Sequence, residues 1–333
     1  MHFGRGLVRN AIAPSSARTY EGYFGSWVQF RREINRGVFL SCQDDAIHNV
    51  WSLIEYIGFA CARKGLRSNT VASHLAAVAY FHRVERAVDL DIHHSLIKNA
   101  LMGLKRSHAV VGSQQRVRRP VSLSMLMDGE HLSVSWGIGG RILWMGLCAS
   151  FLFLPRSSEM FADSVQSYHP LYCLRRSDVA FFRGQKQLCR PDWCEADRVE
   201  VCFRASKGDQ LRLGVVVTRV RVGPALAFRD GGGAVALMTE LMSVSDSYPP
   251  DAPIMTYGVR DSGSLLVWNR YDAVAALRQV VALAGLPPAE FALHSLRIGG
   301  ATHLSAAGVS PEVLQKEGRW SSREHYRKRK HSS

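Results

Sequence analysis

The chain has 333 residues, of which 47% are hydrophobic and 21% are charged. This length is typical of two domains of about 100 to 200 residues each, and the composition excludes a mainly disordered chain. Lysine and arginine outnumber aspartate and glutamate by 42 to 28, which gives a formal net charge of +14. The excess favours a polyanionic partner, because cations placed against phosphates release condensed counterions. A basic protein with no nucleic-acid role would have the same charge.

The longest apolar stretch runs from Ile142 to Pro155, between two arginines. It is shorter than the roughly 20 residues that span a bilayer, so we expect a buried helix and no membrane association. The first 14 residues have no sustained apolar segment before a small-residue cleavage site, so we expect no secretory signal. These features predict an intracellular protein, in the nucleus of a eukaryote or in the cytoplasm or nucleoid of a prokaryote.

The seven cysteines are an odd number in a long chain, which favours reduced thiols over a disulfide framework. Four of them, Cys173, Cys189, Cys194 and Cys202, are close together in the sequence. Zinc ligands usually come in pairs two to four residues apart, and only Cys189 and Cys194 come near that spacing. We therefore expect no metal site.

The first hundred residues predict an all-helical bundle, because apolar residues recur at helical spacing in four segments. The aromatic side chains of the first helix are core candidates: Tyr20, Tyr23, Phe24, Trp27 and Phe30. The second helix is expected from Asp45 to the stop at Gly65, with Val50, Trp51, Ile54 and Ile57 inward. The third is expected from Ser68, with Val71, Leu75, Val78 and Phe81 inward, and the fourth near residues 92–104.

The apolar pattern breaks from Lys105 to Pro120, a basic segment that predicts a linker. Such a linker could lie along a DNA backbone or simply be a solvated spacer. We therefore predict a helical domain over residues 1–108, a basic linker over 109–120 and a second domain over 121–333.

The second domain is predicted to mix helices and strands. After the buried helix come β-like runs at 176–182 and 198–205, and a polar SKGD break at 206–209 predicts a hairpin with the following QLRLGVVVT. Three helices are expected after it: one over Val274 to Val281 closed by Gly285, one from Ser295 to Ala307, and one capped by Ser310 with Pro311 at its first position.

Four segments of the second domain carry cations or a candidate nucleophile. They are FLPRSSEMF (153–161), FRASKGDQLRLG (203–214), HSLRIGGATHLSAAG (294–308) and GRWSSREHY (318–326). In this order they resemble the catalytic segments of tyrosine recombinases, the phage-integrase family. The resemblance covers residues 121–326, and it implies a mixed α+β catalytic domain preceded by an all-α, SAM-like core-binding domain that clamps DNA.

Arg156 and Arg297 match the two arginines of that family. Attack on a phosphodiester adds negative charge to the nonbridging oxygens, and arginine stays charged and meets phosphate oxygens in pairs. A charge placed straight after an apolar helix is costly unless it has a function or a partner. A salt bridge to Glu159 is the alternative explanation for Arg156.

His294 lies three residues before Arg297, so a helix there directs both side chains to one place. The resemblance assigns His294 to proton transfer or to a phosphate oxygen, although a histidine at a helix start is more often a structural hydrogen-bonding residue. Gly299 and Gly300 each cost about 1 kcal/mol in a helix relative to alanine. They predict the close approach of another backbone or of DNA.

Lys207 resembles the lysine that donates a proton to the departing 5′ oxygen, although a lysine in a turn is usually solvated surface. Trp320 fits the position held by histidine or tryptophan in relatives, where its N–H can donate to the phosphate; packing is the alternative. The attacking tyrosine of the family usually follows eight or nine residues later, where this chain has Lys328 and Arg329. Tyr326, six residues on, is the only tyrosine after Arg297, so either it attacks or the C-terminus has diverged.

The resemblance implies a site-specific recombinase or integrase that breaks and rejoins double-stranded DNA through a 3′-phosphotyrosyl bond. It implies no cofactor, and assembly as a homotetramer on paired sites. One alternative is a DNA-binding protein that has kept the cationic pocket and lost cleavage. A second is a relaxing enzyme similar to type IB topoisomerases, which the separate helical domain disfavours.

Overall fold

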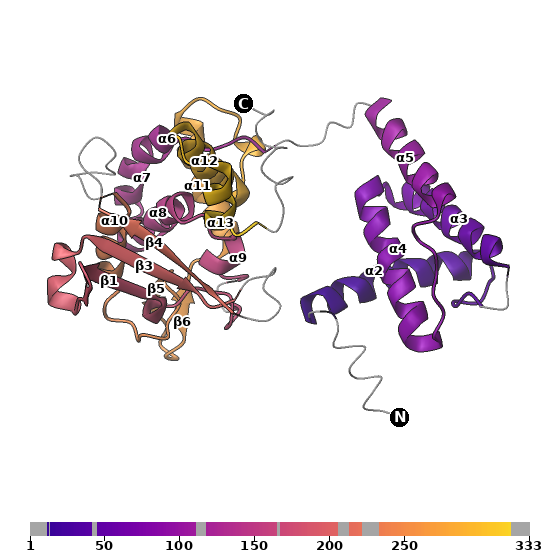
Figure 1. The fold of residues 1–333 in the computed structure, drawn as a ribbon, viewed down its shortest axis with the longest axis horizontal. Coiled ribbons are helices and arrows are strands. Elements are labelled where there is room, and N and C mark those ends of the chain that lie inside the picture. Colours follow the sequence, from indigo (N-terminus) through magenta and orange to yellow (C-terminus); the bar gives the residue numbers. More distant parts are fainter. Residues whose placement is uncertain are drawn as a thin grey trace. The chain divides into compact units, whose positions relative to one another are not determined.

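The computed structural model describes residues 12, 14–41, 45–110, 118–164, 167–205, 213–221 and 233–320. The chain divides into two compact units, Met1–Gln115 and Arg116–Ser333 (Figure 1). The first unit is helical in its described residues, whereas the second combines helices with a small sheet.

The first unit contains four helices: α2 (Pro14–Glu33), α3 (Ala46–Lys64), α4 (Ser68–Arg86) and α5 (Ser95–Val110). The predicted ends of α3 are confirmed. The Asp45 side chain accepts a hydrogen bond from the Ile47 amide, and Gly65 ends the helix in the left-handed conformation at φ 59°. The predicted start of α4 at Ser68 is also confirmed.

Two predictions for this unit are wrong. Trp51 is 52% exposed, because the buried face of α3 follows the spacing of Val50, Leu53 and Ile57 and leaves the next residue outside it. The fourth helix begins at Ser95 and continues to Val110. The first residues of the expected linker are therefore helical, and residues 111–117 lie outside the described part of the chain.

Two buried histidines hold the helices of the first unit together. His82 is fully buried; its Nε2 accepts a hydrogen bond from the Leu40 amide at 3.0 Å, and its Nδ1 lies 2.8 Å from the Val78 carbonyl oxygen. These contacts require a neutral ring with the proton on Nδ1. His74 is stacked on Tyr23 with ring centroids 4.1 Å apart, and its Nδ1 lies 2.7 Å from the Tyr56 hydroxyl.

The first unit should lose stability in acid. Burial lowers the pKa of both His74 and His82 below the ordinary value of 6.5, and the nearby cations Lys64 and Arg31 act in the same direction. The unfolded chain therefore binds these protons more readily, so the stabilisation is complete above pH 6.5 and is lost as the pH falls below it. In thermal unfolding between pH 7.5 and 5, His82→Gln should lose less stability than the wild-type protein. An equal loss in both proteins would contradict this role for His82.

The second unit begins with short helices and a long buried helix, continues through strands, and ends with helices. Its α-helices are α6 (Leu123–Asp128), α7 (Glu130–Ser135), α8 (Gly137–Leu152), α9 (Ser157–Met160), α10 (Gly233–Val244), α11 (Arg270–Leu283), α12 (Leu293–Ala306) and α13 (Pro311–Glu317). Its strands are β1 (Val179–Arg183), β2 (Lys186–Gln187), β3 (Arg198–Phe203), β4 (Val215–Val220), β5 (Thr256–Val259) and β6 (Leu265–Val267). The final three predicted helices are confirmed as α11, α12 and α13.

The main sheet has the order β2-β1-β3-β4, with antiparallel neighbours. The predicted hairpin is confirmed by the pairing of β3 with β4, from Phe203 opposite Val215 to Arg198 opposite Val220. Its second strand starts later than the QLRLGVVVT run, and residues 206–212 lie outside the described part of the chain. The run at 176–182 begins with a 3₁₀ turn, η1 (Arg176–Asp178), before β1.

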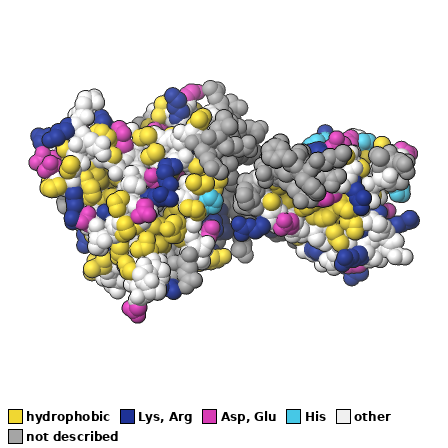
Figure 2. Space-filling view, turned by 90° about the horizontal axis from the view of Figure 1, so that it is seen from below, with side chains coloured by type: hydrophobic (Ala, Val, Ile, Leu, Met, Phe, Trp, Pro, Cys, Tyr) yellow, Lys and Arg dark blue, Asp and Glu magenta, His cyan; other side chains and the backbone are white. Residues whose placement is uncertain are grey.

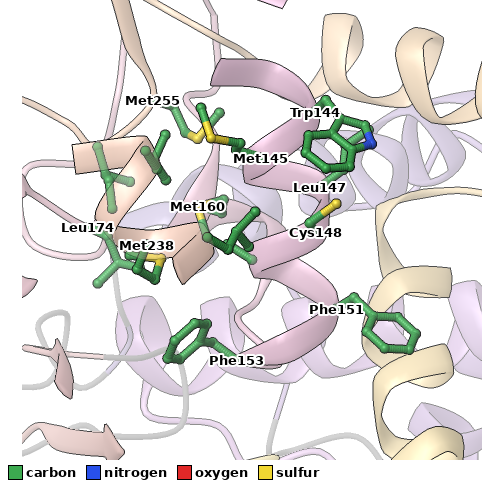
Figure 3. Packing of buried hydrophobic residues seen from close by; sticks show 14 of the residues in the cluster. Trp144, Met145, Leu147, Cys148, Phe151, Phe153, Met160, Leu174, Met238 and Met255 are labelled. Carbon is green, nitrogen blue, oxygen red and sulfur yellow. The ribbon is translucent and has the colours of Figure 1, made fainter. Parts of the chain in front are cut away.

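Helix α8 is the buried helix that the apolar stretch predicts. All but a few of its side chains are buried, and they project on several sides of the helix (Figure 3). Phe151 lies beside His303 of α12, and α8 also packs against α10 and β5, so this one helix contacts elements on several sides. Within the described residues, no helix has the length and hydropathy needed to span a bilayer.

The paired glycines of α12 let this helix approach two other backbones. A Cβ atom on Gly299 would lie 1.9 Å from the Val121 carbonyl oxygen, and one on Gly300 would lie 2.0 Å from the Phe151 carbonyl oxygen. The close approach predicted for these glycines is therefore one of protein backbone. It fixes α12 against α8, the helix that leads to Arg156.

Gly300→Ala should destabilise the second unit, because the added methyl group meets a backbone oxygen that cannot rotate away. Overpacking of this kind costs about 1 to 3 kcal/mol, so thermal unfolding should show a clearly lower melting temperature. Gly58→Ala in α3 is the matched control. Its Cβ would meet nothing within 4 Å, so this change should be neutral or stabilising. Equal melting temperatures for the two variants would contradict the close contact.

Candidate functional site

Four of the six predicted site residues are described. Arg156 is the residue before α9, His294 and Arg297 lie on α12, and Trp320 follows α13. Lys207 and Tyr326 lie outside the described residues. Lys207 belongs to the segment that connects β3 to β4, and Tyr326 follows Trp320 by six residues.

Arg156 and Arg297 converge on consecutive backbone carbonyls after α13. The Arg156 Nη2 atom donates to the Arg319 carbonyl oxygen at 3.5 Å, and the Arg297 Nη2 atom donates to the Gly318 carbonyl oxygen. Arg297 is only 4% exposed, whereas the Arg156 side chain is 26% exposed. The two arginines that the motifs single out therefore lie at one place, and the Arg156 guanidinium is the more accessible to solvent.

The Arg156–Glu159 salt bridge, the alternative explanation for Arg156, is present. The Arg156 Nη1 atom lies 3.0 Å from Glu159 Oε1, and the Arg156 amide donates to Glu159 Oε2 at 2.8 Å. Glu159 is almost fully buried, and a buried carboxylate requires this kind of compensation. The ion pair fixes the start of α9 and does not cover the whole Arg156 side chain.

A third arginine, Arg319, lies beside Arg156 and Glu159. We call Arg156, Glu159, Arg297 and Arg319 the arginine cluster. The Arg319 Nη2 atom lies 2.9 Å from Glu159 Oε2 and donates to the Leu154 carbonyl oxygen at 3.1 Å. Its guanidinium carbon lies 3.6 Å from the centroid of the Phe203 ring at the end of β3. The side chain is 6% exposed, and burial is the main reason that its pKa is lowered. An arginine still keeps its proton at neutral pH.

The backbone at Arg319 is in the left-handed conformation, with φ at 49°. For a residue other than glycine this costs about 1 to 2 kcal/mol. The turn follows α13, where the Gly318 amide donates to the Leu314 carbonyl and the Arg319 amide to the Lys316 carbonyl. The chain turns at this residue, and the side chain enters the interior.

Trp320 packs at the base of the cluster. It is 8% exposed and shares a small apolar cluster with Leu154, Ala301 and Leu314. The Arg297 guanidinium carbon lies 5.3 Å from the centroid of its ring, within the range of a cation–π contact. The packing role considered for Trp320 is therefore observed. His294 is exposed in the first turn of α12, one helical turn before Arg297.

Arg219 connects the β3–β4 hairpin to the ends of α8 and α13. From β4, it donates two hydrogen bonds to the Leu152 carbonyl at the end of α8, and its Nη1 atom lies 2.6 Å from Glu317 Oε2 at the end of α13. Its guanidinium also lies over the Phe153 ring. One side chain thus links β4 to the end of α8, which precedes Arg156, and to the end of α13, which precedes Trp320.

Charges on the visible face of the second unit are dispersed. In Figure 2, Lys and Arg side chains lie beside Asp and Glu side chains, with hydrophobic side chains between them. This agrees with exposed pairs such as Arg141–Glu240 and Arg183–Glu195. Arg119, from the expected linker, pairs with Glu290. Among the described residues, no group of three or more His, Cys, Asp or Glu side chains could hold a metal ion.

Sequence reasoning missed the part played by Arg319 and only partly identified that of Glu159. Both residues lie inside the quoted motifs, but neither belongs to the residue set that the family resemblance supplied. The left-handed turn that directs Arg319 inward has no sequence signal, because glycine or asparagine usually occupies such a position. Only one sequence feature pointed to these residues: Glu159 lies next to apolar residues, and a buried carboxylate needs cationic partners.

No protein-family model matches this chain, and no curated protein matches its sequence. Solved structures do match its fold. XerH site-specific recombinase bound to difH substrate in a pre-cleavage complex aligns with a TM-score of 0.55 and 14% identity, over 93% of this chain and 74% of that one. A lambda integrase dimer bound to a COC′ core site aligns with a TM-score of 0.52 and 13% identity, over 98% and 92%. A post-cleavage XerH complex with a palindromic difH substrate gives 0.52 and 16%, over 87% and 69%. The chain therefore has the fold of the tyrosine recombinases.

Proposed function

We propose that this protein is a DNA strand transferase of the tyrosine-recombinase type, which breaks and rejoins DNA at specific sites. The observation that carries the proposal is the convergence of Arg156 and Arg297 on the backbone at Gly318 and Arg319. Phosphoryl transfer adds charge to the nonbridging oxygens, and two fixed guanidinium groups are suited to stabilise it. The chain then continues from this point toward Tyr326.

In the proposed reaction, the Tyr326 hydroxyl attacks the scissile phosphorus. A 3′-phosphotyrosyl bond forms as the bond to the 5′ oxygen breaks, and Lys207 donates the proton that the 5′ oxygen requires. His294 assists proton transfer or bonds a phosphate oxygen, and Trp320 supports the pocket. A 5′ hydroxyl from another strand reverses the step. One phosphodiester replaces another, so the reaction consumes no nucleotide cofactor.

The proposed partner is double-stranded DNA. The XerH and lambda integrase structures that share this fold are complexes with DNA, and the lambda integrase complex is a dimer. The net charge of +14 also favours a polyanion. We assign DNA clamping to residues 1–108 together with the basic linker 109–120, and catalysis to residues 121–333. Assembly as a homotetramer on paired sites belongs to the same proposal.

A second candidate is a DNA-binding protein that retains the pocket and does not cut. The spacing of the nucleophile favours it: Tyr326 follows Trp320 by six residues, whereas Lys328 and Arg329 hold the usual positions. Such a protein would bind DNA through the same arginines and form no covalent bond.

Nicked suicide duplexes with a randomised central sequence separate the two candidates even though the target sequence is unidentified. The wild-type protein should form an adduct with DNA that survives denaturation, because loss of the short 5′ fragment prevents religation. Tyr326→Phe should abolish the adduct while keeping DNA binding, since only the hydroxyl is removed. Gel mobility after denaturation measures the adduct, and gel mobility of the native complex measures binding.

Tyr271→Phe is the matched control, because Tyr271 is an 80% exposed tyrosine on α11 that has no part in the proposed reaction. The Tyr271→Phe protein should form the adduct at the wild-type rate. An adduct that persists in Tyr326→Phe would refute the nucleophile. DNA binding with no adduct in the wild-type protein would support the second candidate.

A further inference from the structure

The buried carboxylate of Glu159 is shared between two guanidinium groups. The Arg156 Nη1 atom lies 3.0 Å from Glu159 Oε1, and the Arg319 Nη2 atom lies 2.9 Å from Glu159 Oε2. Glu159 is 1% exposed, so these two cations provide the compensation that its charge requires. The Arg156 guanidinium therefore contacts one carboxylate oxygen and does not form the bidentate pair that arginine and carboxylate often adopt.

Arg319 is a costly residue for this position if its role is only structural. Its backbone is left-handed, its side chain is almost fully buried, and it lies close to a second cation, Arg156. Its Nε and Nη1 atoms are buried without a hydrogen-bond partner among the described residues. A buried donor left without a partner destabilises the fold, and an apolar side chain of similar size would avoid that penalty.

The charge of the cluster offers a reason for the residue. Arg156 and Arg319 share a single carboxylate, which leaves a surplus of one positive charge among these three side chains. Without Arg319, Glu159 would neutralise Arg156, and no surplus charge would remain among these side chains. The exposed edge of Arg156 is the part that a DNA phosphate can reach, so its charge is the one that must be kept available.

We propose that Arg319 is a positioning residue for the phosphate site: it occupies half of the Glu159 carboxylate, so that Arg156 keeps its charge and its exposed edge for a DNA phosphate. This inference rests on the proposed function, because it assumes that Arg156 and Arg297 receive a phosphate. It adds a third arginine to the pair that the motifs identify. Arg319 acts through Glu159 and Arg156 and is not assigned a contact with DNA.

Inorganic phosphate is the probe for the test. Its dissociation constant follows from the rise in melting temperature of the full chain with phosphate concentration at constant ionic strength. Arg319→Met should weaken phosphate binding by at least about tenfold. In this variant Arg156 turns to Glu159, and the phosphate loses a charged hydrogen-bond donor. The double change Arg319→Met with Glu159→Gln restores the surplus charge, and its phosphate affinity should return to within about threefold of wild type.

Two further variants separate charge from packing. Arg319→Lys keeps the cation without the planar group that covers Phe203, and should bind phosphate nearly as the wild-type protein does. Arg183→Met removes one cation from the exposed Arg183–Glu195 pair and should leave the affinity unchanged. If Arg319→Met does not fold, Arg319→Lys and the double variant still test the proposal.

A double variant that binds phosphate as weakly as Arg319→Met would overturn the charge-sharing role. So would an Arg319→Met protein with wild-type affinity, or an Arg319→Lys protein that loses as much as Arg319→Met. The phosphate measurement does not involve Tyr326 or DNA cleavage. The predicted pattern without any DNA adduct would therefore support the role of Arg319 and reject strand transfer, whereas an adduct without the pattern would reject this inference alone.

Discussion

The Glu159 carboxylate holds together the segments that carry the proposed phosphate site. It receives Arg156 from the start of α9 and Arg319 from the turn after α13, two positions far apart in the sequence. Because the carboxylate is almost fully buried, either cation alone would leave a less well compensated charge in the interior. The interaction therefore couples the turn after α13 to Arg156, the residue before α9.

The rest of the second unit supports this arrangement by close packing. The glycines of α12 bring its backbone against Val121 and Phe151, which sets the depth at which Arg297 reaches the cluster. Arg219 adds a link from the hairpin to the ends of α8 and α13. Each of these contacts involves a backbone carbonyl or a partly buried ion pair, and such groups tolerate little displacement. Of the described residues of the proposed site, Arg156, Arg297 and Trp320 are thus held by closely packed elements.

The sequence was most informative where the local pattern had one solution. Periodic apolar residues, Asp45 and Gly65 defined α3, and the apolar stretch before Arg156 defined a buried helix. The pattern failed for Trp51, because hydrophobicity alone does not tell which side of a helix faces the core. It also placed the end of the fourth helix too early, since α5 continues through basic residues as far as Val110.

Within the site, the motifs identified Arg156 and Arg297 as a pair, and the structure brings them together. Arg319 could not be found in this way, because its inward direction depends on a left-handed turn and on Phe203 from another strand. Both are properties of the tertiary structure. The arginine between Gly318 and Trp320 changes the charge of the pocket, and the residue set taken from the family resemblance does not include it.

A structure of the Tyr326→Phe protein bound to a duplex would show whether the arginine cluster receives one DNA phosphate. In that structure we expect a single phosphate within hydrogen-bonding distance of both Arg156 and Arg297, while Glu159 still pairs with Arg319. A duplex whose phosphates contact other surfaces, with Arg156 still closed on Glu159, would contradict this expectation.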